Sequence, residues 1–243
     1  MKKIILSSIF GIFFLGYTTL FAQSSGSIEI KNSQENIYHL KIGIHPAVAF
    51  AGFANKDFRT QIQNSTGVKI TDAQFGGNFQ IGMYSDKRWG IGLEYNIFGS
   101  MSPFASSKPT YKFYNMYEGL YGEYEFVKTS RFVFSGQLAL GITQASFRYQ
   151  SGLSEDKIPL GDFLNLPMSK GFEVKQKIQG YVSLGLRAEW ILAKGFRLGL
   201  FAKWVQQTGK ANWYTMDGAT VVDGLPKSSM TPLQVGISLI FTL

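Results

Sequence analysis

Four charged residues of this sequence have the types and spacing that ion pairing or ion conduction would use. Glu94, Glu123, Arg187 and Lys203 lie in four separate segments, each on the polar side of an alternation of polar and apolar residues. Alternate side chains of a β-strand point to opposite faces, so these four would project from one face of a sheet. If that face lines a narrow interior, each charge needs a partner, because an unpaired buried charge is costly.

Two roles are open for these four residues. They could form a salt-bridge plug that closes the interior and fixes the register of the strands, or they could line a polar path or gate for small solutes. Further charged residues share their parity but lie nearer the segment ends: Lys41, Glu125, Lys177, Glu189 and Arg197.

The two histidines, His39 and His45, are the remaining candidates for chemistry. A catalytic histidine needs a nucleophile and an orienting carboxylate within reach, and no recognisable Ser/His/Asp or Ser/His/Glu arrangement accompanies either one. They lack a clustered third metal ligand, the chain has no cysteine, and no glycine loop for phosphate is present. The sequence therefore predicts no catalytic site, no metal site and no cofactor.

The elements that would position these residues are β-strands, because polar and apolar residues alternate with period two. Eight segments show this pattern, at about 38–51, 74–83, 89–98, 116–126, 132–147, 177–190, 196–205 and 231–243. Most are long enough for a tilted membrane crossing of about 9–11 residues. Pro46 predicts a bulge or a strand end in the first segment. Glu118 falls on the apolar side of the fourth, where we expect it only at the outer rim.

The connections between these segments alternate between long and short. Long ones cover residues 53–70, 99–112, 149–176 and 207–229, and short ones cover 85–88, 127–131 and 192–195. An up-and-down barrel with both termini in the periplasm has this asymmetry, with short periplasmic turns and longer extracellular loops. The predicted fold class is all-β, an eight-stranded antiparallel up-and-down transmembrane β-barrel. Within the longest loop, the apolar segment 158–168 would either pack on itself or act as a lid or contact surface.

The apolar face could line a cavity, as in a soluble lipocalin-like barrel, or face lipid. Three observations favour lipid: the polar face is rich in glycine and amides, no C-terminal helix follows the last strand, and aromatic residues gather at strand ends. Near the short connections these are Tyr84, Trp89, Tyr124, Phe126, Phe132, Trp190, Phe196 and Phe241, and near the long ones Phe50, Tyr114, Phe147, Tyr149 and Trp204.

The first residues are typical of an export signal. Lys2 and Lys3 precede an apolar stretch over residues 4–15, which is short for a retained membrane anchor of about 20 residues. We expect cleavage after Ala22, with Gly26 as the alternative. The expected organisation is a signal peptide at 1–22, an extension at 23–36 and a barrel at 37–243. The net charge of +8 comes from dispersed Lys and Arg, which favours anionic lipid over nucleic acid as a partner.

The signal peptide, the alternating strands, the long and short loops and the terminal strand Ile237–Leu243 together resemble the small outer-membrane barrels of the OmpA/OmpX type, or porin-like family, of Gram-negative bacteria. This resemblance implies a bacterial outer-membrane location, recognition by the barrel-assembly machinery, and interior ion pairs that favour the plug. We therefore expect a monomeric, non-enzymatic barrel that acts in envelope integrity or binds a surface ligand through its loops. A narrow channel is the alternative, and a lipid-modifying enzyme using His39 or His45 is a third possibility.

Overall fold

The computed structural model describes residues 38–50, 56–101, 110–150, 171–229 and 232–243. The expected signal peptide at 1–22, the extension at 23–36 and the apolar loop segment at 158–168 lie outside these described residues.

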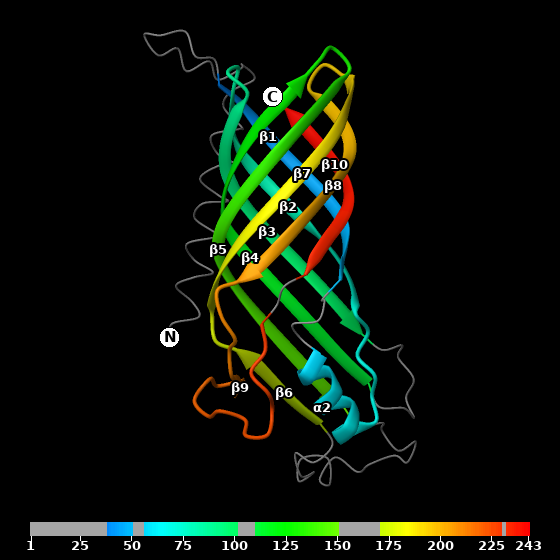
Figure 1. Cartoon of the computed structure of the whole chain (residues 1–243), viewed down its shortest axis with the longest axis vertical. Coiled ribbons are helices and arrows are strands. Elements are labelled where there is room, and N and C mark those ends of the chain that lie inside the picture. The colour runs from blue at the N-terminus through cyan, green and yellow to red at the C-terminus, as the bar shows by residue number, and fades with distance from the viewer. Residues whose placement is uncertain (1–37, 51–55, 102–109, 151–170, 230–231) are drawn as a thin grey trace, which may run out of the picture.

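Eight long strands of the described chain form one closed antiparallel sheet. They are β1 (Tyr38–Phe50), β2 (Ala73–Ser85), β3 (Trp89–Met101), β4 (Thr110–Lys128), β5 (Phe132–Gln150), β7 (Gln179–Ala193), β8 (Phe196–Gln207) and β10 (Leu233–Thr242). Each pairs with the long strands before and after it in the chain, and β1 pairs with β10 to close the barrel. Figure 1 shows these strands strongly tilted, with the C-terminus at the end that carries the short turns. The predicted eight-stranded up-and-down barrel is confirmed.

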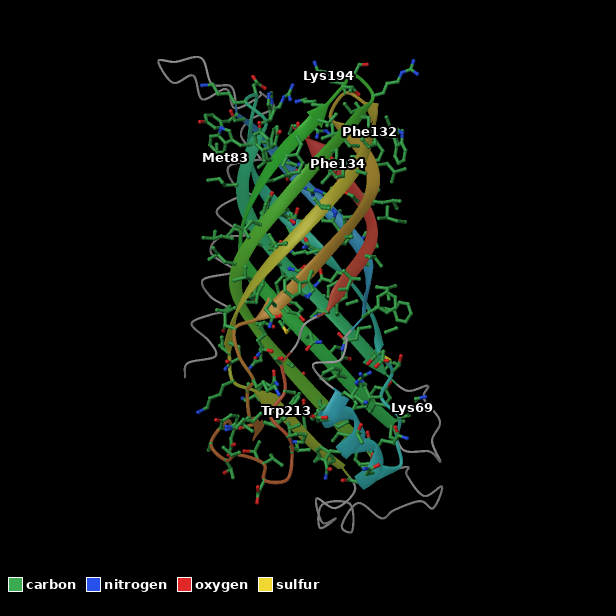
Figure 2. The ribbon with its side chains drawn as sticks, in the orientation of Figure 1. Lys69, Met83, Phe132, Phe134, Lys194 and Trp213 are labelled. Atoms are coloured by element: carbon green, nitrogen blue, oxygen red, sulfur yellow. The ribbon has the colours of Figure 1, made fainter. Side chains whose placement is uncertain are left out.

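The outer wall of this barrel presents apolar side chains to its surroundings. Phe75, Ile91 and Leu200 are 69%, 59% and 60% exposed, whereas a soluble barrel would bury such residues. At the short-turn end the outer aromatic rings contact one another, as in the pairs Phe132–Trp190 and Phe196–Phe241, with ring centroids 5.7 and 5.2 Å apart. An exposed apolar belt with an aromatic girdle is the outer surface of a transmembrane barrel of the outer-membrane type. Figure 2 shows Phe132 and Phe134 near this end.

Three of the aromatic residues expected in the girdles have inward parity instead, and one of them, Tyr149, packs against the buried apolar cluster that contains Phe147. Tyr84 is 3% exposed and Phe147 is fully buried, so neither faces lipid. All three lie near a strand end, but the girdle residues are those of the opposite parity.

The expected bulge at Pro46 is wrong. Strand β1 continues through Pro46, and its pairing with β10 pauses after Ile44 and resumes at Ala47 in the same register. The missing proline N–H therefore interrupts the ladder between β1 and β10 without shifting its register.

Glu118 of β4 pairs with Tyr95 and Ile142 on the neighbouring strands. It lies eight residues before Phe126, an outward aromatic residue near the periplasmic end of the same strand. Eight residues rise about 20 Å in a tilted strand, so Glu118 lies in the loop-side part of a belt about 25 Å tall, below its rim.

The loop end carries structure that the alternation did not predict. The helix α2 (Lys56–Thr66) lies within the connection 53–70, and the short strands β6 (Gly171–Gln176) and β9 (Trp213–Thr215) extend the sheet beyond β5. Figure 1 shows all three gathered at the end opposite the C-terminus. Within the described residues, no helix has the length and apolar character needed to span a membrane. We call α2, β6, β9 and the adjoining ends of β4 and β5 the extracellular head.

Candidate functional site

The interior of the barrel, its lumen, holds an ion-pair cluster on the periplasmic side. Glu123 sits between two cations: Lys41 Nζ lies 2.7 Å from its Oε1, and the Arg187 guanidinium contacts its Oε2. Arg187 Nε also lies 3.4 Å from Glu189 Oε1, and Arg197 contacts Glu125. All these side chains are buried, so opposite charges inside the barrel neutralise one another.

A second ion pair lies further toward the loop end. Lys203 Nζ donates to Glu94 Oε1 at 2.6 Å, and the Tyr181 hydroxyl donates to the same oxygen at 2.8 Å. Gln80 Nε2 donates to Glu94 Oε2 at 3.1 Å. Asn78 Nδ2 donates to the same Oε2 at 3.4 Å. Glu94 is therefore neutralised by one cation and held in place by three neutral donors, and the five residues come from four strands.

Gln80 and His45 connect the two ion-pair clusters. The Gln80 side chain accepts from Arg187 at 3.2 Å while it donates to Glu94. His45 is 2% exposed, its Nε2 lies 3.4 Å from Arg187, and its ring packs edge-on against Phe201. The cavity at this level has a volume of about 10 Å³, which is room for about one water molecule.

Apolar residues form a separate cluster at the loop end of the barrel. The Phe58 ring of α2 stacks on Trp213 of β9 at 4.2 Å and packs edge-on against Phe147 of β5 at 5.5 Å. Ile62 lies one helical turn after Phe58, so both point to the same side of α2 and both are buried. In Figure 2, Trp213 lies at this end of the molecule, among the elements of the head. The helix thus packs its apolar side against the inward faces of β4, β5 and β9 at the loop end.

The four residues proposed from the sequence all lie in the lumen and form two pairs, Glu94 with Lys203 and Glu123 with Arg187. Four of the five charges assigned to the segment ends are part of the periplasmic cluster: Lys41, Glu125, Glu189 and Arg197. The expectation for Lys177 is wrong, because it is exposed between β6 and β7, where its Nζ lies 4.4 Å from the centre of the Tyr214 ring.

Sequence reasoning missed the neutral members of the network, Gln80 and Tyr181. Both have inward parity, and an amide or a hydroxyl on that side of a strand is the signal that could have identified them.

The two histidines occupy different environments. His39 lies at the short-turn end, with its Nε2 3.1 Å from Asp86, whereas His45 is buried in the lumen. Neither contact supplies a nucleophile together with an orienting carboxylate. In the described part of the chain, no three His, Cys, Asp or Glu side chains cluster in a way that could hold a metal ion.

A scan against protein-family models finds no match, and a search of curated proteins finds none. Solved structures of similar shape include a major outer membrane protein from Thermus thermophilus, with a TM-score of 0.48 and 10% identity over 85% of this chain and 99% of that one. Neisserial surface protein A has a TM-score of 0.47 and 10% identity over 85% and 96%. The outer membrane protease OmpT from Escherichia coli has a TM-score of 0.41 and 10% identity over 90% and 100%. One fold hosts many functions, so these likenesses assign none to this chain.

Proposed function

We propose that this chain is a closed, non-enzymatic barrel of the bacterial outer membrane. The filled lumen supports this proposal most directly. Two ion-pair clusters joined by Gln80 occupy the barrel, and the buried rings of Phe98, Tyr117 and Tyr181 pack inside it as well. An open pore needs a continuous water-filled path, and the cavity between the clusters is about 10 Å³.

We propose further that the protein acts in envelope integrity or in surface interaction through its extracellular head. The head has an apolar core of its own, built around Phe58, Phe113, Phe147 and Trp213. Such a core gives the extracellular surface a fixed shape, which suits recognition of a partner better than free loops do. Outer-membrane lipid and the barrel-assembly machinery are the other partners in this proposal. A monomer is the proposed state, since the eight-stranded sheet closes on itself.

Conductance of the refolded mature protein in a planar bilayer tests the closed barrel. Folded samples are selected by the faster gel migration of the unboiled barrel. We expect no steps for the wild type. Discrete steps from folded wild type, with a conductance that changes in the Glu94→Gln variant, would contradict the proposal and support a narrow channel instead.

A further inference from the structure

The segments around β9 form a small sheet in the extracellular head, and its two faces differ. β6 pairs with β9, and an isolated bridge joins Ala211 to Ser228 just before β9. One face packs on the ring cluster around Phe58. The residues of that face are buried: Val174, Gln176, Ala211, Trp213 and Ser228. Alternate residues of these segments must therefore point to the opposite face, away from the core.

The opposite face carries four lysines: Lys175, Lys177, Lys210 and Lys227. Each is next in sequence to a buried residue of the core face. Extending the registers by one residue puts Lys177 and Lys227 beside Asn212. Neighbouring strands are about 5 Å apart, and residues i and i+2 of one strand are about 7 Å apart. The four lysines therefore share one continuous surface, which we call the basic face.

Tyr214 supplies an aromatic ring within the basic face. It is the ladder partner of Lys175 and is bridged on its other side to Val221. The Lys177 Nζ lies 4.4 Å from the centre of its ring, and Lys175 donates to the main-chain oxygen of Met216. A ring flanked by cations is a platform on which a sugar ring can stack while its acidic substituent meets an ammonium group.

Three acids lie near the basic face, and none is in an ion pair with its lysines. Glu173 pairs with Arg148 at 3.5 Å. Asp217 and Asp223 accept hydrogen bonds within their own turns, from the main-chain N–H groups that follow them. In the described part of the chain, no ion pair is formed by Lys175, Lys177, Lys210 or Lys227. The face therefore keeps a positive excess, which attracts anions over about 8 Å at physiological ionic strength.

The residue types favour a polymer of acidic sugars as the ligand. The lysine ammonium is a compact point charge, whereas recognition of a single phosphate or carboxylate favours the arginine fork. Spaced lysines thus suit a ligand whose charges repeat along its length. Single-stranded nucleic acid has repeating charges, but it uses an aromatic ring for each of several bases, and Tyr214 is a single ring. A polysaccharide with carboxylates on its sugars needs only one.

The basic face lies beyond the apolar belt. Lys177 directly precedes Ile178, whose side chain is 56% exposed. On β5, the ladder partners of the outward residues of β6 are Ser146 and Arg148, where the wall below has leucines. In Figure 2, Trp213, on the core face of the same sheet, lies at the loop end of the molecule. A polymer in the extracellular medium can therefore reach the face without entering the membrane.

We propose that the basic face binds an acidic polysaccharide whose sugars carry carboxylates. The carboxylates meet the ammonium groups of Lys177, Lys210 and Lys227, and one sugar ring stacks on Tyr214. This inference rests on the proposed surface role of the head, and it does not depend on whether the lumen conducts.

Calorimetric titration of the refolded mature protein with polygalacturonate fragments, in a nonionic detergent, tests the face. We expect binding that weakens as salt is added, and no binding of the uncharged polysaccharide dextran. Lys177→Gln with Lys227→Gln should weaken binding about tenfold. Lys56→Gln with Lys69→Gln removes the same charge at exposed lysines elsewhere in the head and is the matched control. Equal losses in the two double variants, or equal binding of dextran, would overturn the proposal.

Two further arms separate the classes of ligand. Tyr214→Ala should weaken binding about fivefold and Tyr214→Phe should not, because the ring and not the hydroxyl stacks on the sugar. Single-stranded DNA should bind more weakly than polygalacturonate. Gel migration of the unboiled samples confirms that each variant is folded. Tighter binding of DNA, or unchanged affinity in Tyr214→Ala, would contradict the assignment to a sugar polymer. A folded wild type that binds neither polymer would reject this ligand, whereas a silent bilayer would still support the closed barrel.

Discussion

The membrane-spanning wall and the extracellular head have opposite polarity, although the same two strands build both. In the wall, β4 and β5 point Leu120 and Leu140 outward and Glu123 inward. Further along the same strands, in the head, Phe113 and Phe147 point inward and are fully buried. The outward positions there become Lys112, Gln144, Ser146 and Arg148. The surrounding medium explains the inversion, because lipid accepts apolar side chains and water accepts polar ones.

This comparison separates two ways of filling a barrel. In the wall the interior is held by charge neutralisation, as in the Glu123 contacts with Lys41 and Arg187. In the head the interior is held by ring packing around Phe58 and Trp213. The two regions should therefore respond differently to the loss of one side chain.

The largest effect is expected from Glu123→Ala. It leaves Lys41 and Arg187 buried without their shared acid, and removing one partner of a buried ion pair costs about 3–5 kcal/mol. We expect the free energy of unfolding, measured by urea titration in lipid vesicles, to fall by that amount. Glu173→Ala is the matched control, because Glu173 forms a partly exposed pair with Arg148 at 3.5 Å, and its loss should cost less than about 1 kcal/mol. Equal losses of stability in the two variants would mean that Glu123 contributes no more to folding than an ion pair at the surface does.

Phe58→Ala should loosen the head and leave the wall intact. It removes a fully buried ring that stacks on Trp213, a change that costs about 3–5 kcal/mol where the site cannot collapse. Hydrogen exchange should accelerate in β6 and β9 and stay unchanged in β7 and β8. Met216→Ala, at an exposed apolar residue in the turn directly after β9, should change neither. Faster exchange throughout the barrel would show that head and wall fold as one unit.

An arginine scan of the outer face of β5 tests the polarity inversion itself. Leu138→Arg places a charge nearer the middle of the apolar belt and should cost about 2–4 kcal/mol. Ser146→Arg has the same outward parity on the same strand but lies in the head, where we expect a cost of about 0–1 kcal/mol. Unfolding titrations in vesicles measure both. A similar cost at the two positions would place Ser146 within the bilayer.

The sequence predicts the wall better than the head for a physical reason. Lipid outside and a narrow lumen inside require apolar and polar residues to alternate in every wall strand. A single segment such as 89–98 can therefore be recognised as a wall strand from its own sequence. In the head, Phe113 and Phe147 keep their inward parity, but there the inward side chains are apolar, whereas in the wall they are polar. The helix α2 has only Phe58 and Ile62 as apolar residues at helical spacing, a signal too weak to separate it from a loop.

The lumen shows the same limit at the level of single residues. Parity placed Glu94 and Lys203 in the interior, but their pairing depends on which strands face each other across the closed barrel. Alternation carries no information about shear or strand order across the lumen. Gln80 connects both ion-pair clusters through contacts with Arg187 and Glu94, and an isolated glutamine gives no sign of that role.

The smallest effect is expected at Asp217, in the turn after β9. Its carboxylate accepts hydrogen bonds from the Thr215 hydroxyl and from the Ala219 N–H at 3.0 Å, and these donors hold its pKa below the ordinary value, Thr215 contributing most. Because the pKa of Asp217 is lower in the folded turn than in the unfolded chain, its ionised carboxylate stabilises the turn. This stabilisation is complete above the ordinary pKa and is lost as the pH falls through the pKa of the folded turn. The Ala219 amide should therefore lose protection in acid, as measured by NMR hydrogen exchange after correction for the intrinsic rate. Asp217→Asn should remove this pH dependence and Asp223→Asn should not. If the pH dependence of Ala219 exchange persists in Asp217→Asn, another titrating group is responsible for it.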